Sequence, residues 1–337
     1  MVLMRSDHLR ALLEAFVKKD DIKFIQMANE MIEEEERKNH QLLAKDLREI
    51  LLKATIGPNR LDTTIDKNKR NPAIPRDMAK GFPLVQIQEP HLYLSDAILA
   101  PELITSINML VQEIKLKDII KSYGLKPRQK FLFFGPPGTG KTLTAHIISS
   151  ILQWPLVTVR FESVISSFLG ETATNIRRIF DFIENGEWIV LFDEFDIIGK
   201  NRDDANEHGE IKRVVNNLIQ MIDNFHGDAI IIAATNHEQL LDPAIWRRFD
   251  DVLHFDLPDA ERRKLIFEKY LHNYPGWNAL NLDDFVNITN GFSPADIARA
   301  CEEALRLSIV KNESNITAEQ IYFAIERQQQ RIELNIH

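Results

Sequence analysis

Residues 130–142 read Lys-Phe-Leu-Phe-Phe-Gly-Pro-Pro-Gly-Thr-Gly-Lys-Thr, and this stretch decides the fold. The apolar run at 130–134 is typical of a buried parallel strand, and the octet at 135–142 fits the pattern G-x-x-x-x-G-K-[ST]. Residues 142–148 then predict a helix. A helix that begins behind a glycine loop offers unpaired N–H groups and the positive end of its dipole, which together favour an anion. The stretch therefore predicts a strand, a loop and a helix that bind phosphate.

The polar residues of the octet have distinct expected roles. Lys141 would reach the β- and γ-phosphates of a nucleotide, and the hydroxyl of Thr142 would ligate Mg²⁺. The alternative is a turn that binds nothing, but the strand, the loop and the helix all agree with the phosphate interpretation. The residues whose backbone would cradle the phosphates are Gly135, Pro136, Pro137, Gly138, Thr139 and Gly140.

Polar side chains also follow two later apolar runs. Asp193 and Glu194 come directly after residues 188–192, and Asn236 ends the run that begins at residue 229. Ligands bind at the carboxyl edge of parallel sheets, so Asp193 is expected to hold Mg²⁺ and Glu194 to polarise a water as general base. Asn236 could hydrogen-bond the γ-phosphate or that water. Acids at a strand end and an asparagine in a turn are common alone, but after a phosphate loop they indicate nucleotide hydrolysis.

Composition limits the remaining possibilities. The 337 residues carry a formal charge of −9, which argues against broad adhesion to nucleic acid. The single cysteine, Cys301, excludes an internal disulfide and fits a reducing compartment. No apolar stretch reaches the ~18 residues of a membrane span. We expect a soluble, cytoplasmic protein that binds neither membrane nor nucleic acid.

Patterning predicts four parts. Residues 1–56 show apolar positions at helical spacing and predict a small helical domain, and residues 57–92 contain the prolines and glycines of a linker. From 93 to 258 strands alternate with helices, as in a parallel α/β sheet, and residues 259–337 are helical.

Two helix starts stand out in the C-terminal part. Ser293, Pro294 and Asp296 supply an N-cap, a proline at the first helical position and an acid at the third. Thr317 and Gln320 form a second capping box that opens the last predicted helix.

These motifs, in this order, resemble the AAA+ ATPases, specifically the branch of the proteasomal ATPases, katanin, spastin and FtsH. Gly135–Thr142 matches Walker A, Asp193 and Glu194 match Walker B, and Asn236 matches sensor 1. The resemblance covers roughly residues 93–335. It implies a P-loop core with a parallel sheet, a C-terminal helical lid, and Mg²⁺-dependent hydrolysis of ATP to ADP and phosphate.

The resemblance extends to a subunit interface. Residues 241–250 read Leu-Asp-Pro-Ala-Ile-Trp-Arg-Arg-Phe-Asp and are similar to the family's second region of homology. Arg247 and Arg248 would act as fingers on the nucleotide of a neighbouring subunit, in a homo-oligomeric ring expected to be a hexamer. The adjacent pair is closer to katanin and spastin than to members that read Arg-Pro-Gly-Arg. The alternative is a pair of surface arginines.

Two further segments resemble nucleotide contacts of the family. Residues 291–296 are similar to the lid signature Gly-Phe-Ser-Gly-Ala-Asp, which carries no sensor-2 arginine, and Ala295 would pack near the ribose or adenine. Asp96, Ala97 and Ile98 resemble the turn that contacts adenine.

An expected substrate contact lies before the apolar run at 188–192. Residues 166–171, Ser-Ser-Phe-Leu-Gly-Glu, resemble pore loop 1, an aromatic–aliphatic–glycine triplet that faces the channel of a ring. Phe168 and Leu169 would grip a polypeptide substrate there. Alternatively, both side chains belong to the local core.

The sequences of several segments are more similar to one bacterial group of AAA+ ATPases than to the family in general. The N-terminal helices, the proline-rich linker, and the segments at 168–171, 193–196 and 246–251 resemble AAA+ ATPases encoded beside subtilisin-like serine proteases. That resemblance implies a two-component system with such a protease as partner, in bacterial defence. The chain itself has neither a metalloprotease spacing of histidines nor a nucleophile elbow.

The sequence thus predicts a ring-forming ATPase that remodels, unfolds or threads protein and feeds or regulates a separate protease. One alternative is a nucleotide-gated switch that controls a partner complex, and another is a DNA-handling AAA+ ATPase. The acidic charge and the lack of a basic aromatic channel argue against the DNA alternative.

Overall fold

A computed structural model describes residues 73–77, 81–161, 164, 169–196, 208–237, 239 and 243–334. The chain divides into two compact units, Met1–Pro72 and Ala73–His337. The expected helical domain at 1–56, and the expected linker at 57–72 and 78–80, lie outside the described residues.

The second unit alternates strands and helices up to residue 254 and is helical afterwards. Its elements are β1 (Val85–Gln88), the 3₁₀ turn η1 (Leu94–Asp96), α4 (Pro101–Lys115), α5 (Lys117–Ser122), β2 (Lys130–Phe134), α6 (Lys141–Leu152), β3 (Leu156–Val159), α8 (Leu169–Ile183), β4 (Ile189–Phe192), α10 (His208–Asp223), β5 (Ile230–Thr235), α11 (Pro243–Trp246), β6 (Asp251–His254), α12 (Ala260–Leu271), η3 (Trp277–Ala279), α13 (Leu282–Ile288), α14 (Pro294–Val310) and α15 (Ala318–Leu334).

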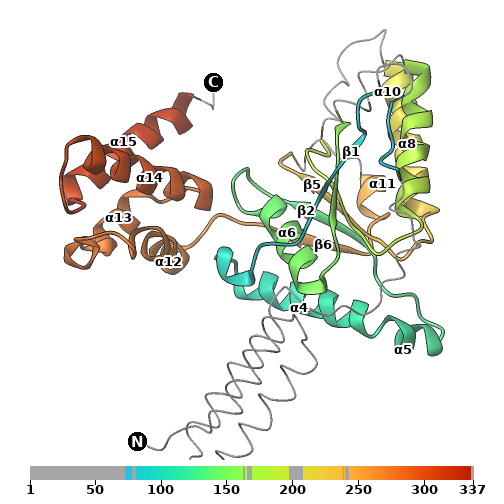
Figure 1. Ribbon diagram of the computed structural model, residues 1–337, viewed down its shortest axis with the longest axis horizontal. Helices are drawn as coiled ribbons and strands as arrows, with labels where there is room; N and C mark the ends of the chain where they lie inside the picture. Colours follow the sequence, from blue (N-terminus) through green and yellow to red (C-terminus); the bar gives the residue numbers. More distant parts are fainter. Residues whose placement is uncertain are drawn as a thin grey trace, which may run out of the picture. The chain divides into compact units, whose positions relative to one another are not determined.

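Six strands form one sheet in the order β1-β3-β4-β5-β2-β6 (Figure 1). Only β1 runs antiparallel to its neighbour within this sheet. Phe134 pairs with Thr235 and Phe192 with Ala233, so β2, β4 and β5 end at the same edge. The mixed α/β fold with a mostly parallel sheet is confirmed, and so are the strands predicted at 130–134, 188–192 and 229–235.

Helices cover both faces of the sheet, which explains why the central strands are nearly continuous apolar runs. On β4, Val190 and Phe192 face the core shared with α8 and α10, whereas Ile189 and Leu191 face the core shared with α4 and α6. Figure 1 shows α8 and α10 on one side of the sheet and α4 and α6 on the other. The alternation of strand side chains divides this half of the molecule into two cores.

β1 lies inside the segment expected to be a linker. Leu84, which precedes it, is fully buried, and its N–H donates to the carbonyl of Pro75 at 2.9 Å. The N–H of Arg160 donates to the carbonyl of Leu84 at 3.0 Å, and the Asn175 amide donates to Asp77 Oδ1 at 3.2 Å. β1 and Leu84 thereby cover the edge of β3, whose backbone N–H and C=O groups would otherwise be unpaired. The alternating sequence Val-Gln-Ile-Gln is too short to announce a strand next to so many prolines.

The C-terminal helical region, α12 to α15, has its own core around Phe267 and Phe285. Both halves of the predicted capping box are present at α14, with Asp296 N–H donating to Ser293 Oγ and Ser293 N–H donating to Asp296 Oδ2. At α15, Thr317 N–H donates to Gln320 Oε1 at 2.9 Å. Among the described helices, none has the length and apolar character needed to cross a membrane.

Candidate nucleotide-binding site

Two glycines of the loop between β2 and α6 occupy positions that only glycine fits. Gly135 has φ +139°, and a Cβ there would lie 2.0 Å from the carbonyl oxygen of Phe255. Gly138 has φ +76°, and a Cβ there would lie 2.6 Å from Ser293 Oγ. The loop therefore packs backbone to backbone against the residue that follows β6, and directly against the start of α14. The N–H of Ala295 also donates to the carbonyl of Gly138 at 3.2 Å.

Lys141 opens α6 with its side chain buried. Its ammonium donates to the carbonyls of Gly135 at 2.8 Å and Pro136 at 2.7 Å, folding back over the loop. Burial lowers the pKa of Lys141 to about 8, although the nearby carboxylates of Asp193 and Asp196 oppose the shift. A negatively charged ligand on the loop would restore the ordinary preference for the charged form.

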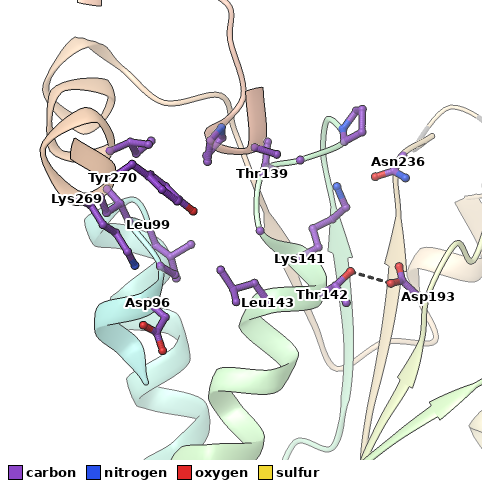
Figure 2. A pocket seen from close by; sticks show the side chains of 18 of the residues that line it. Asp96, Leu99, Thr139, Lys141, Thr142, Leu143, Asp193, Asn236, Lys269 and Tyr270 are labelled. Atoms are coloured by element: carbon purple, nitrogen blue, oxygen red, sulfur yellow. Dashed lines mark hydrogen bonds between the residues drawn. The ribbon is translucent and has the colours of Figure 1, made fainter. Parts of the chain in front are cut away.

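Asp193, the first residue of the acidic pair, contacts the first turn of α6 from the end of β4. The Thr142 hydroxyl donates to Asp193 Oδ2 at 2.7 Å, as the dashed line in Figure 2 shows. Asp193 Oδ1 accepts the N–H of Glu194 at 2.9 Å. Glu194 has φ +51°, a left-handed conformation that is uncommon outside glycine and costs free energy. Its exposed carboxylate lines a cavity that Lys141, Thr142 and Asp193 also line.

Asn236 reaches this cavity because β5 is tied to the acidic segment. The N–H of Phe195 donates to the carbonyl of Ala234 at 2.8 Å. The Thr235 hydroxyl donates to the buried Asp196 at 3.3 Å and accepts the N–H of His237 at 3.1 Å. These bonds end β5 in a tight turn and leave Asn236 beside the acidic pair.

A cavity of about 420 Å³ collects most of the predicted residues (Figure 2). Gly135 and Pro136 do not line it, and instead supply the carbonyls that hold Lys141. The predicted residues that do line it are Asp96, Ala97, Ile98, Pro137, Gly138, Thr139, Gly140, Lys141, Thr142, Asp193, Glu194, Asn236 and Ala295.

Sequence reasoning missed one wall of the cavity. Ile266, Lys269 and Tyr270 line it from α12, and Figure 2 shows Lys269 and Tyr270 on the same side of the cavity as Asp96 and Leu99. The Lys269 ammonium donates to the carbonyl of Ser95 at 2.8 Å. Nothing in the sequence of α12 singles these residues out, because their charged and aromatic side chains are typical of an ordinary surface helix.

The two arginines lie elsewhere and differ from each other. Arg247 and Arg248 are exposed in the turn after α11, and neither lines the cavity. Arg248 pairs with Asp223 at the end of α10. The Arg247 guanidinium makes no hydrogen bond or ion pair with any residue in the part of the chain that the structure describes. The predicted pore residue Phe168 lies outside that part, and for Leu169 only the backbone, at the start of α8, is described.

The P-loop class of nucleotide-binding proteins is defined by a glycine loop at the carboxyl edge of a parallel sheet and an acid at the end of another strand. Here the loop follows β2 and the acid, Asp193, follows β4. The family model described as "ATPase family associated with various cellular activities (AAA)" matches residues 131–257. The chain is also 38% identical over 317 residues to a protein named "Uncharacterized AAA family ATPase y4kL" from Sinorhizobium fredii. This match covers 93% of the present chain and 92% of the relative. The chain belongs to the AAA family of ATPases.

Two other relatives match over part of their length. A protein named "Proteasome-activating nucleotidase" from Sulfurisphaera tokodaii is 33% identical over 249 residues, 72% of this chain and 64% of that one. A "Cell division cycle protein 48 homolog" from Archaeoglobus fulgidus is 34% identical over 221 residues, 63% of this chain and 30% of that one. In both cases the chain spans less than two thirds of the relative.

The lowered pKa of Lys141 predicts that ATP binding takes up a proton near pH 8. Without ligand, about half of the molecules carry a neutral Lys141 at that pH, whereas triphosphate charge favours the ammonium. Affinity should therefore fall as the pH rises above 8, by up to about tenfold per pH unit. Calorimetry at pH 8 in two buffers of different ionisation enthalpy measures the proton uptake.

A variant that keeps its charge provides the control for this prediction. In Lys141→Arg the guanidinium stays protonated across the range, so the slope of affinity against pH should flatten even if absolute affinity drops. Equal binding heats in both buffers, together with wild-type affinity that stays constant from pH 7 to 9, would contradict the assignment.

Proposed function

We propose that the chain is an Mg²⁺-dependent ATPase that assembles into a ring and uses hydrolysis to remodel, unfold or thread protein. The observation that carries the ATPase part is the hydrogen bond between Thr142 and Asp193 beside the buried Lys141. It joins the first turn of α6 to the residue that follows β4, two segments far apart in sequence. A cation, a hydroxyl and a carboxylate then meet at one end of a cavity large enough for a nucleotide.

The residues at that end suit Mg²⁺. The Thr142 hydroxyl and the Asp193 carboxylate are hard oxygen ligands, and Mg²⁺ in nucleotide sites takes few protein ligands and leaves the rest to phosphate and water. When bound, Mg²⁺ would neutralise part of the phosphate charge. In this proposal Lys141 binds phosphate, Glu194 accepts a proton from the attacking water, and Asn236 orients that water.

We predict that Lys141→Ala abolishes nucleotide binding, whereas Glu194→Gln keeps binding and loses turnover. Lys141 meets phosphate charge in the ground state, but Glu194 is needed only when water attacks. Fluorescent-nucleotide binding and phosphate release, measured on both variants, separate the two roles. If Glu194→Gln lost ATP affinity as severely as Lys141→Ala, Glu194 would be a structural residue or a metal ligand.

The arginines are proposed to act between subunits. A guanidinium that neutralises charge at the γ-phosphate accelerates NTP hydrolysis by about 10³–10⁵. Neither arginine lines the cavity of its own chain. Arg248 is paired with Asp223, whereas the Arg247 side chain has no partner among the described residues. We assign Arg247 as the finger in a neighbouring subunit. Arg248, paired with Asp223, holds the turn against α10.

Complementation tests this assignment. Arg247→Ala and Lys141→Ala subunits should each be inactive alone, and mixing them should restore part of the activity because each supplies what its neighbour lacks. Turnover per subunit of the wild type should also rise with protein concentration. A steady-state phosphate assay, run on the mixture and on a dilution series of the wild type, measures both effects. Concentration-independent turnover without complementation would place the arginine in its own subunit or outside catalysis.

The protein-directed output rests on sequence and on the relatives. Residues 166–171 resemble a pore loop, and one relative is named for activating the proteasome. The acidic composition suits a protein partner better than nucleic acid. This proposal includes a hexameric ring, a subtilisin-like serine protease as partner and a role in bacterial defence, which the sequence resemblance supports. It also includes a cytoplasmic location, which the composition supports.

Phe168 tests the output. If its ring grips polypeptide, Phe168→Ala should keep ATP binding and assembly while losing stimulation of the ATPase by unfolded protein, and Phe168→Tyr should be tolerated. If Phe168 is a core residue, truncation should instead cost about 3–5 kcal/mol of unfolding free energy. A melting curve beside the stimulation assay distinguishes the two. Stimulation by DNA but not by unfolded protein would favour the DNA-handling alternative, and stimulation by neither would favour a nucleotide-gated switch.

A further inference from the structure

The two ends of the cavity have different chemistry. One end carries Lys141, Thr142 and Asp193 and suits phosphate. The other end is lined by the apolar and aromatic side chains of Ile98, Leu99, Ile266 and Tyr270, which suit a flat heterocycle, with the charged Asp96 and Lys269 beside them. Figure 2 shows Lys269 and Tyr270 on one side of the cavity and Thr142, Asp193 and Asn236 on the other.

The wall at the heterocycle end is built from two segments that lie 174 residues apart in sequence. One segment is η1 with the residues that follow it, and the other is α12. Ile98 packs against the core of the C-terminal helical region, whereas Ala97 packs against the core between the sheet and α4. The turn therefore lies at the junction of two separate cores.

η1 is short, and hydrogen bonds fix it. The Asp96 carboxylate accepts the N–H of Tyr93 at 2.8 Å, and Ala97 N–H donates to the carbonyl of Leu94 at 3.2 Å. The carbonyl of Ser95 accepts the ammonium of Lys269. This bond reaches from α12 to the backbone of the turn, so it fixes the distance between the two segments of the wall.

We propose that Lys269 is a positioning residue for the nucleobase: its bond to Ser95 holds the turn at 94–98 against α12 and thereby preforms the base end of the cavity. Preforming the wall removes an ordering cost from binding. Lys269 lies away from Lys141 and the acidic pair, so its contribution concerns the base and not the phosphates. The inference rests on the proposed nucleotide site but not on the proposed protein-directed output.

The test compares ligands that share one end of the cavity. In full-length Lys269→Met, which keeps the aliphatic stem and removes the donor, affinity for ATP and ADP should fall by about tenfold, the effect of one lost hydrogen bond with its ordering. Affinity for inorganic tripolyphosphate, which lacks a base, should stay within about twofold of the wild-type value, a difference of about 0.4 kcal/mol. Lys269→Arg, which keeps a donor of similar reach, should restore most of the ATP affinity.

Lys264→Met is the matched control, because Lys264 lies on the same helix and pairs with the exposed Asp283 outside the cavity. It should leave both affinities unchanged, and the melting temperatures of the two methionine variants should agree. Equal losses for ATP and tripolyphosphate, or no loss for ATP, would overturn the positioning role. Failure of the wild-type protein to bind ATP at all would instead overturn the nucleotide site itself.

Discussion

The Lys141 ammonium lies buried at the start of α6, and a buried charge is costly unless polar groups surround it. Here the loop supplies them, because the carbonyls of Gly135 and Pro136 both turn toward Nζ. That orientation depends on the unusual φ of Gly135, which a side chain would forbid by collision with Phe255. The phosphate loop is thus organised around a cation before any ligand arrives.

The same loop couples the sheet to the C-terminal helical region. Gly138 contacts Ser293 and Ala295 at the phosphate end of the cavity, and Lys269 reaches Ser95 at the other end. A ligand spanning the cavity would lie between these two attachments and would contact both parts of the unit. A movement of the helical region relative to the sheet would strain or break at least one of these attachments. A ligand that contacts both parts would therefore favour the arrangement seen here over a displaced one.

Local signals predicted the central elements well. The apolar runs ending at Phe134, Phe192 and Thr235 are strands, and the capping box at Ser293 opens α14 with the expected bonds. Most of the predicted phosphate residues, with the predicted metal and sensor residues, also line one cavity, because parallel strands bring their carboxyl ends to one edge. These features depend on residues close together in sequence or on a general rule of sheet topology.

Other features depend on tertiary contacts that sequence patterns do not encode. β1 exists because Leu84 finds a buried site and β3 offers an open edge, not because four alternating residues demand a strand. Lys269 and Tyr270 are part of the site only because α12 lies beside η1.

The left-handed backbone of Glu194 is a third feature of this kind. Such strain, about 1–3 kcal/mol, persists only where surrounding structure fixes the chain. Here Asp193 accepts the N–H of Glu194, and Phe195 bonds Ala234 on β5, so the backbone of the proposed general base is held from both sides. The position of its carboxylate consequently depends on the register between β4 and β5, and a shift of that register would displace Glu194 relative to Asn236.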